Sequence, residues 1–192
     1  IWSNTNNTTD PLTFVPLLCN GTDTDGGAPG FIPDGTTCQP GNTQPPSGGD
    51  ISTSNSAVLD GTTTDTVSNG GGYDATYSGS GTVYTQLATY TSDPATNTGN
   101  FFGTGSQFFD VFASVLSSDP SATLTVTFPG LTDGQVLRWW DGTSWHPIIS
   151  NDGTTPVVAS GGSATVIFGA SSSPRLDQLD GAPISAGDPA AI

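Results

Sequence analysis

The chain lacks three of the residues that favour helices most, because its 192 residues contain no Glu, no Lys and no Met. Thr, Val, Tyr and Phe, which suit strands, are plentiful. Charged residues make up only 10% of the chain, against about 25% in an average domain. Thr, Ser, Asn, Gly and Asp must therefore cover most of the surface, and the composition as a whole predicts an all-β fold.

Positive charge is scarce: Arg138 and Arg175 stand against seventeen acidic residues, all of them Asp. The net charge of −15 excludes nucleic acid as a natural partner, since phosphate binding requires clustered Lys and Arg. An anionic membrane surface is excluded on the same ground. No run approaches the ~20 apolar residues of a membrane span, so we expect no membrane insertion.

The positions of the Asp residues explain why there are so many of them. Seven precede Gly and four precede Pro. Asp-Gly supplies the positive φ of tight turns, and Pro restricts the residue before it to extended or turn geometry. Most of the acid is therefore expected in the turns of a strand-rich protein. The Asp-Gly turns at 133, 141 and 152 lie 8 and 11 residues apart, a spacing typical of a β-sandwich or barrel.

Segments between these turns have the composition of strands. We expect strands at 51–59, 73–78, 82–91, 107–116, 122–128, 135–140, 144–149, 156–159, 164–168 and 182–185. Alternation is cleanest at 122–128, where Leu124, Val126 and Phe128 share one face. The segment 107–116 also fits a helical stripe, so a short helix is the alternative to the strand that we favour there.

Residues 1–50 differ from the remainder, so we divide the chain into an irregular N-terminal extension, 1–50, and a β-sandwich domain, 51–192. The Pro-rich and Gly-rich run 38–50 predicts a loop or linker. Cys19 and Cys38 are the only cysteines, and we expect them to form one disulfide, with two free thiols as the alternative. A chain of this composition that starts without Met is typical of a secreted protein whose signal peptide has been removed. We therefore expect an extracellular, cell-surface location.

The extension contains three N-glycosylation sequons, at Asn6, Asn7 and Asn20. The first two overlap, so only one of them is expected to be modified. All three lie in irregular sequence, where an acceptor would be exposed.

A calcium site in the extension is the one cofactor that the sequence suggests. Asp23 and Asp25 stand at alternate positions, as oxygen ligands do at the start of a calcium loop, and Asp34 follows nine residues later. No Glu closes the pattern. Solvated turn carboxylates are therefore the alternative to a Ca²⁺ site.

The stretch QVLRWWDGTSWHPII predicts a hairpin. If the Asp-Gly pair at 141 forms its two-residue loop, Trp140 pairs with Thr143 and Arg138 lies opposite Trp145. Trp140 and Trp145 are then candidates for a platform on which a glycan could stack. Aromatic packing that stabilises the hairpin is the plainer interpretation.

Catalytic motifs are missing from the sequence: it contains no GxSxG, no HExxH, no P-loop and no dinucleotide fingerprint. His146 is the only His and has no other His or Cys near it in sequence, so we interpret it as a strand residue without a catalytic role. With no Lys and no free thiol expected, acid–base chemistry has few candidates. We therefore expect no enzymatic activity.

Four segments, FFDVFASV, ATLTVTFPGL, VLRWWDGTSWHPI and RLDQLDGAPISAG, resemble β-sandwich modules of secreted prokaryotic cell-surface proteins. In such modules a strand that ends in Trp or Tyr, an Asx-Gly turn and a second Trp precede a late LxxLxGxP segment. The resemblance implies a surface protein and assigns no catalytic residue. The expected fold class is an immunoglobulin-like or jelly-roll β-sandwich with an irregular, disulfide-stapled N-terminal extension.

Two functions fit these expectations, and we favour the first. The chain could be a structural subunit of an extracellular filament, such as a pilus, or of a surface layer, with copies of itself as partners. In donor-strand complementation a terminal segment of one copy adds as a strand to the next. The candidate donor is LTFVPLL, with Leu12, Phe14 and Leu18 on one side, although it could also be the first strand of its own sandwich. The second function is a carbohydrate-binding or adhesive surface module, with or without Ca²⁺, that uses the two Trp of the hairpin.

Overall fold

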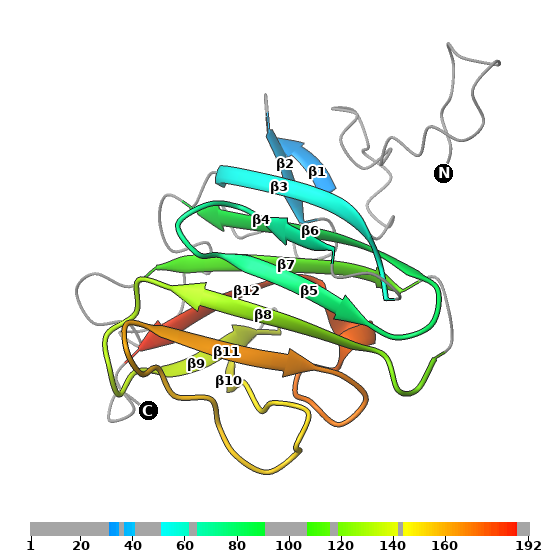
Figure 1. Ribbon diagram of the computed structural model, residues 1–192. Helices are drawn as coiled ribbons and strands as arrows, with labels where there is room; N and C mark the ends of the chain where they lie inside the picture. The colour runs from blue at the N-terminus through cyan, green and yellow to red at the C-terminus, as the bar shows by residue number, and fades with distance from the viewer. Residues whose placement is uncertain are drawn as a thin grey trace, which may run out of the picture.

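The structure, a computed structural model, describes the backbone of residues 31–34 and 37–40 and, in more detail, residues 51–61, 65–90, 107–115, 119–141 and 144–187. Within these residues the protein is all-β, and the one helical element is a 3-10 turn, η2 (Leu176–Gln178). None of their helical segments has the length and apolarity to cross a membrane. The strands form two antiparallel sheets stacked as a sandwich (Figure 1). The predicted all-β fold is confirmed.

The larger sheet has six strands in the order β10-β9-β12-β7-β6-β3. They are β3 (Ile51–Asp60), β6 (Thr82–Tyr90), β7 (Phe108–Val115), β9 (Val136–Trp140), β10 (Trp145–Pro147) and β12 (Asp180–Gly187). The smaller sheet has the order β11-β8-β5-β4. It consists of β4 (Thr66–Ser68), β5 (Asp74–Ser78), β8 (Thr123–Pro129) and β11 (Ser163–Phe168).

A separate hairpin, β1 (Phe31–Asp34) and β2 (Thr37–Pro40), precedes both sheets. Its second strand occupies the start of the run 38–50, which the sequence predicts to be irregular. The extension, which the sequence predicts to be irregular, therefore contains one hairpin among its described residues.

Most strand predictions are confirmed, and the exceptions have simple causes. The segment 107–116 is a strand, β7, and not a helix. β4 was not predicted because three residues are too few to show a period. The expected strand at 156–159 makes only isolated bridges, from Pro156 to Ile149 and from Val158 to Val136. Pro156 has no N–H to donate to a ladder, which limits regular pairing at that point.

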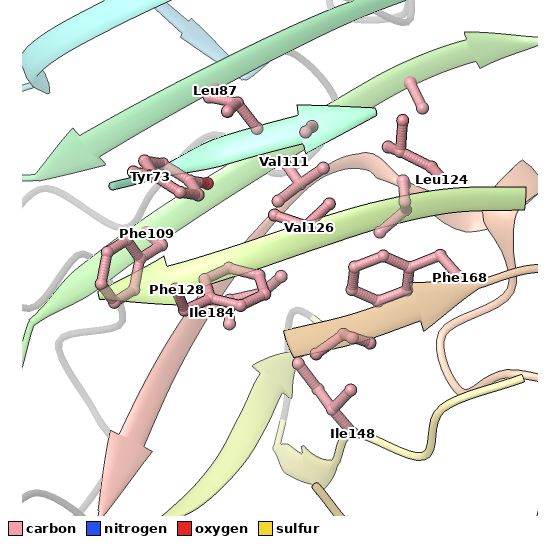
Figure 2. Close-up of a cluster of buried hydrophobic side chains, with 14 of the residues drawn as sticks. Tyr73, Leu87, Phe109, Val111, Leu124, Val126, Phe128, Ile148, Phe168 and Ile184 are labelled. Atoms are coloured by element: carbon pink, nitrogen blue, oxygen red, sulfur yellow. The ribbon is translucent and has the colours of Figure 1, made fainter. Parts of the chain in front are cut away.

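The hydrophobic core lies between the two sheets (Figure 2). In β8, Leu124, Val126 and Phe128 are 0% exposed, while the Thr residues between them are partly exposed, so the predicted alternation is confirmed. Phe128 contacts Tyr73 and Phe109 with ring centroids 5.6 and 5.3 Å away, and Tyr73 and Phe109 are 5.0 Å apart. This aromatic trio joins the residue before β5 and the start of β7 to β8.

Side-chain amides join the two sheets along one side. Asn55 in β3 donates its Nδ2 proton to the carbonyl oxygen of Ser68 in β4, at 2.7 Å. Asn69 Nδ2 donates to the Thr53 carbonyl oxygen at 3.3 Å and to Thr53 Oγ1 at 3.1 Å. These bonds involve side chains and are not part of a backbone ladder. β3 therefore remains an edge strand, which two side-chain amides attach to the four-stranded sheet.

Asp119 connects two loops at one end of the sandwich. Its Oδ1 accepts hydrogen bonds from the Ser121 hydroxyl (2.6 Å) and amide (2.8 Å). Its Oδ2 accepts from the Ser80 amide (2.7 Å) and hydroxyl (2.9 Å). These bonds, with the Ser121 hydroxyl foremost, hold the pKa of Asp119 well below its usual range.

The sandwich begins and ends at the same end of the six-stranded sheet. Ile51, the first residue of β3, pairs with Tyr90, the last residue of β6. Gly187, the last residue of β12, pairs with Val136, the first residue of β9. The register of β7 with β6 and β12 places both pairs at one end, and the loops held by Asp119 lie at the other.

Candidate functional site

β7 is buried on both faces. Phe109 and Val111 point into the core, and the alternation of side chains along a strand turns Asp110 and Phe112 to the opposite face. We call this opposite face, which points away from the four-stranded sheet, the outer face. Asp110 is only 1% exposed and Phe112 5%. The unbroken run FFDVF is a sequence signal for burial on both sides, and the strand prediction did not use it.

The burial extends over much of the outer face. We call its buried residues the outer-face cluster: Gln86, Ala88, Tyr90, Asp110, Phe112, Arg138, Trp140, Pro183 and Ser185. β2 lies against β12 and β3, on the side away from the four-stranded sheet (Figure 1). The outer face is therefore an interior surface, and the described part of the N-terminal extension packs beside it.

A carboxylate lies within the outer-face cluster. The Tyr90 hydroxyl donates to Asp110 Oδ2 at 2.5 Å, and from the core side the Tyr73 hydroxyl donates to the Asp110 carbonyl oxygen at 2.6 Å. Burial first, and then the charge of Asp110, raise the pKa of both tyrosines well above its usual value. Both hydroxyls are therefore neutral donors at ordinary pH, and they link three strands instead of exchanging protons.

The register of the aromatic hairpin differs from the prediction. Trp145 pairs with Trp140, and Pro147, not Trp145, lies opposite Arg138. The prediction was wrong because the turn closes one residue later than expected. The Asp141 amide donates to the Ser144 carbonyl oxygen at 3.1 Å, and Asp141 Oδ1 accepts from the Ser144 amide at 2.7 Å. Asp141 thus takes the first position of the turn, where its side chain can close the loop.

The two Trp of the hairpin lie together, with ring centroids 5.6 Å apart and planes tilted by 51°. Trp140 belongs to the outer-face cluster and is 7% exposed, whereas Trp145 is partly exposed. Arg138, beside them on β9, is 8% exposed, and burial lowers the pKa of its guanidinium. Of the two candidate stacking residues, Trp145 is therefore the more exposed to solvent.

His146 has two polar partners that sequence reasoning missed. Its Nε2 lies 2.7 Å from Asp141 Oδ2 and 2.9 Å from Ser144 Oγ. The sequence signal for these contacts is the close spacing of Asp141, Ser144 and His146 around one turn. A Ser–His–Asp relay needs the hydroxyl and the carboxylate on opposite ring nitrogens, and here both lie at the same one. The geometry therefore does not activate Ser144 as a nucleophile.

Most of the other predicted site residues lie outside the described residues. They are the candidate donor residues Leu12, Phe14 and Leu18, the sequons at Asn6, Asn7 and Asn20, and Cys19, Asp23 and Asp25. Cys38 and Asp34 lie in β2 and β1, of which the structure gives the backbone alone. In the part of the chain with described side chains, no three His, Cys or Asp residues are grouped to hold a metal ion. The disulfide, the Ca²⁺ site and the glycosylation sites remain predictions.

No protein-family model matches this chain, and neither the curated proteins nor the solved structures contain a significant match to it. The residues of the chain and their geometry are therefore the basis of the proposals that follow.

Proposed function

We propose that this chain is a structural subunit of an extracellular filament or surface layer, in which copies assemble by strand addition. The observation that carries the proposal is the edge of β3. This ten-residue strand pairs with β6 along its length, and its other side has no ladder partner among the described residues. An edge of this kind is a template for the backbone of another chain.

The side chains of β3 do little to prevent such pairing. Natural edge strands are blunted by Lys, by Pro, by bulges or by being very short. β3 (ISTSNSAVLD) has no Lys and no Pro, and its one irregularity of register lies at its start, between Ile51 and Thr53. Residues 52–56 are exposed, and Val58 is 59% exposed. The strand therefore offers a long, nearly neutral edge to a partner.

The other three edges are protected. β4 and β10 have only three residues each. On β11, the Ile167 carbonyl oxygen accepts a hydrogen bond from the Asn151 amide at 2.8 Å, and the Ile167 amide donates to Ser150 Oγ at 3.0 Å. The segment at 150–151 thus occupies the C-terminal part of that edge. β3 has one comparable contact, from Asn69 Nδ2 to the Thr53 carbonyl oxygen near its start, and the remainder of its edge supports β3 as the acceptor.

The N-terminal extension is the natural source of the donor. LTFVPLL, with Leu12, Phe14 and Leu18 on one side, has the apolar alternation of a donor strand. The described part of the extension, β2, already lies against β3 and β12 of its own subunit. A neighbour's extension could reach the same region, so this packing supports exchange between copies.

Electron microscopy of the undisrupted native material would test the proposal. We expect regular fibres or sheets, and we expect them to disappear when residues 1–18 are removed. Compact monomers in native material would overturn self-assembly. Assembly that survives the deletion would exclude the proposed donor.

A pair of lysine variants would test the acceptor edge. S54K/S56K places two charges on exposed positions of β3, and T125K/T127K places the same two charges on partly exposed positions of β8. Since both of these β8 residues are paired with β5 on one side and with β11 on the other, the second variant changes no edge. We expect assembly to be lost in the first variant and retained in the second. Equal behaviour of the two would show that β3 is not the acceptor.

The same proposal includes an immunoglobulin-like or jelly-roll form of the sandwich, secretion to the cell surface and glycans on the extension.

Carbohydrate binding through the hairpin is the alternative. The partly exposed ring of Trp145 favours it, and the burial of Trp140 weakens it. Loss of glycan binding in Trp145→Ala, from material that stays monomeric, would favour this alternative over assembly.

A further inference from the structure

A cleft of about 260 Å³ opens at the end of the sandwich where β3 begins. Its walls come from five places in the sequence, namely Thr53, the turn Asn69–Gly71 with Tyr73, Thr89, Gln107 with Phe109, and Pro129 with Gly130. The volume is just below the roughly 300 Å³ at which ligand pockets usually begin. It therefore suits one small molecule or the terminal unit of a larger one.

The lining of the cleft is neutral at every residue that the structure describes. None of its residues is charged, although the chain carries seventeen acidic residues and a net charge of −15. A cation would find no carboxylate there, and an anion would find no guanidinium. Hydroxyls and amides, from Thr53, Thr89, Asn69 and Gln107, provide the polar surface. Pro129, which is partly exposed, provides apolar surface, since Phe109 and Tyr73 at the base of the cleft are each only 1% exposed. The chemistry fits a neutral ligand with many hydroxyl groups.

The polar side chains of the cleft are already held in place. Thr53 Oγ1 and Thr89 Oγ1 lie 2.7 Å apart, and Asn69 Nδ2 donates to Thr53. Gln107 Nε2 donates to the Gly130 carbonyl oxygen at 3.2 Å. Among the described residues no donor reaches Asn69 Oδ1 or Gln107 Oε1. Two fixed amide oxygens thus remain as acceptors, and such preorganisation lowers the cost of binding.

The turn beside the cleft leaves it accessible. Gly70 and Gly71 have φ of +84° and +63°, and a Cβ on either residue would meet no atom within 4 Å. A larger residue at these positions would be strained and would project into open space. The glycines therefore allow the turn its conformation, and no side chain projects from them beside Asn69.

We propose that this cleft binds a single neutral sugar ring, with Asn69 and Gln107 accepting hydrogen bonds from its hydroxyl groups. The site is distinct from the hairpin of Trp140 and Trp145, and it does not depend on self-assembly.

Saturation-transfer difference NMR of the full chain would test this proposal, since the method works for monomers and for large assemblies. The probes are D-glucose, D-galactose, D-mannose and N-acetyl-D-glucosamine. We expect saturable binding of at least one of them, with a Kd of about 1 mM, as befits a few hydrogen bonds. Asn69→Ala and Gln107→Ala should each weaken it about tenfold, the loss expected for one hydrogen bond.

Two matched variants serve as controls. Asn55→Ala removes an amide that joins the same two sheets but does not line the cleft. Gln135→Ala removes an amide oxygen that accepts from the Thr132 amide elsewhere. Both should bind like the unchanged chain, and far-UV circular dichroism should show all four variants folded. The proposal is overturned if no probe saturates, if the cleft variants bind normally, or if Trp145→Ala abolishes the binding instead.

Discussion

We expect the stability of the sandwich to fall steeply in alkaline solution because of Tyr73 and Tyr90. Their side chains are 1% and 6% exposed, and both hydroxyls donate to Asp110. Burial, and then the charge of Asp110, raise both pKa values in the folded protein. In the unfolded chain each tyrosine returns to its ordinary pKa of about 10.

The sign and size of the effect follow from proton linkage. Above pH ~10 the unfolded chain releases these protons while the folded protein keeps them, so the free energy of unfolding falls as the pH rises. Each tyrosine contributes a slope of about 1.4 kcal/mol per pH unit, and the two together about 2.7, until the folded pKa values are reached. Well below pH ~10 these two groups add no slope.

Guanidinium unfolding, followed by far-UV circular dichroism from about pH 8 to about pH 11, would measure this slope. Tyr73→Phe and Tyr90→Phe should each remove about half of it. At neutral pH Tyr90→Phe should cost about 1.5–3 kcal/mol, because its acceptor is a carboxylate, and Tyr73→Phe about 0.5–1.5. A double variant with the same alkaline slope as the unchanged chain would refute the reasoning.

Two further substitutions test the core and the loops. Phe128→Ala, at a residue with no exposed surface, should lower the free energy of unfolding by about 3–5 kcal/mol in guanidinium titrations. Thr127→Ala on the opposite face should change it by about 0.5 kcal/mol or less. Asp119→Asn should lower the melting temperature at neutral pH and weaken its acid dependence. The pKa of Asp119 is depressed in the folded state, so its contribution is present above pH ~4 and is lost as the pH falls further. An unchanged acid profile in Asp119→Asn would contradict that assignment.

Local chemistry was enough to predict much of the fold. Leu124, Val126 and Phe128 alternate with Thr, and a period of two allows only one face to be buried. The Asp-Gly pairs at 133 and 152 form the turns that the residue types require, with φ of +88° at Gly134 and +74° at Gly153. These features depend on neighbours in sequence, which a single sequence displays directly.

Sequence reasoning missed one local choice and two features that depend on distant partners. To predict the pairing of Trp140 with Trp145, one would have to know that the Asp141 side chain closes the turn. The alternative is a turn that is displaced by one residue along the chain. Burial of Asp110 is indicated in the sequence only by the run FFDVF, and what packs against the outer face depends on segments far from it in the chain. The cleft combines residues from Thr53 to Gly130, and their proximity arises from the pairing of β3 with β6 and of β6 with β7, together with the packing of the four-stranded sheet on these strands.

β3 starts and β12 ends at the same end of the sandwich, and this arrangement decides how the sandwich would respond to a pulling force. Any chain before Ile51 and any chain after Gly187 is attached at that one end, so the end held by Asp119 is a free tip. Tension between the two attachments would not stretch the sandwich along its strands. Instead it would separate β3 from β6, starting at Ile51 and breaking one hydrogen-bonded pair after another. Under tension, the first strand to separate would be β3, the strand that we propose as the acceptor for a neighbouring copy. The cleft beside it, which we propose as a sugar site, would be the first site to lose its shape.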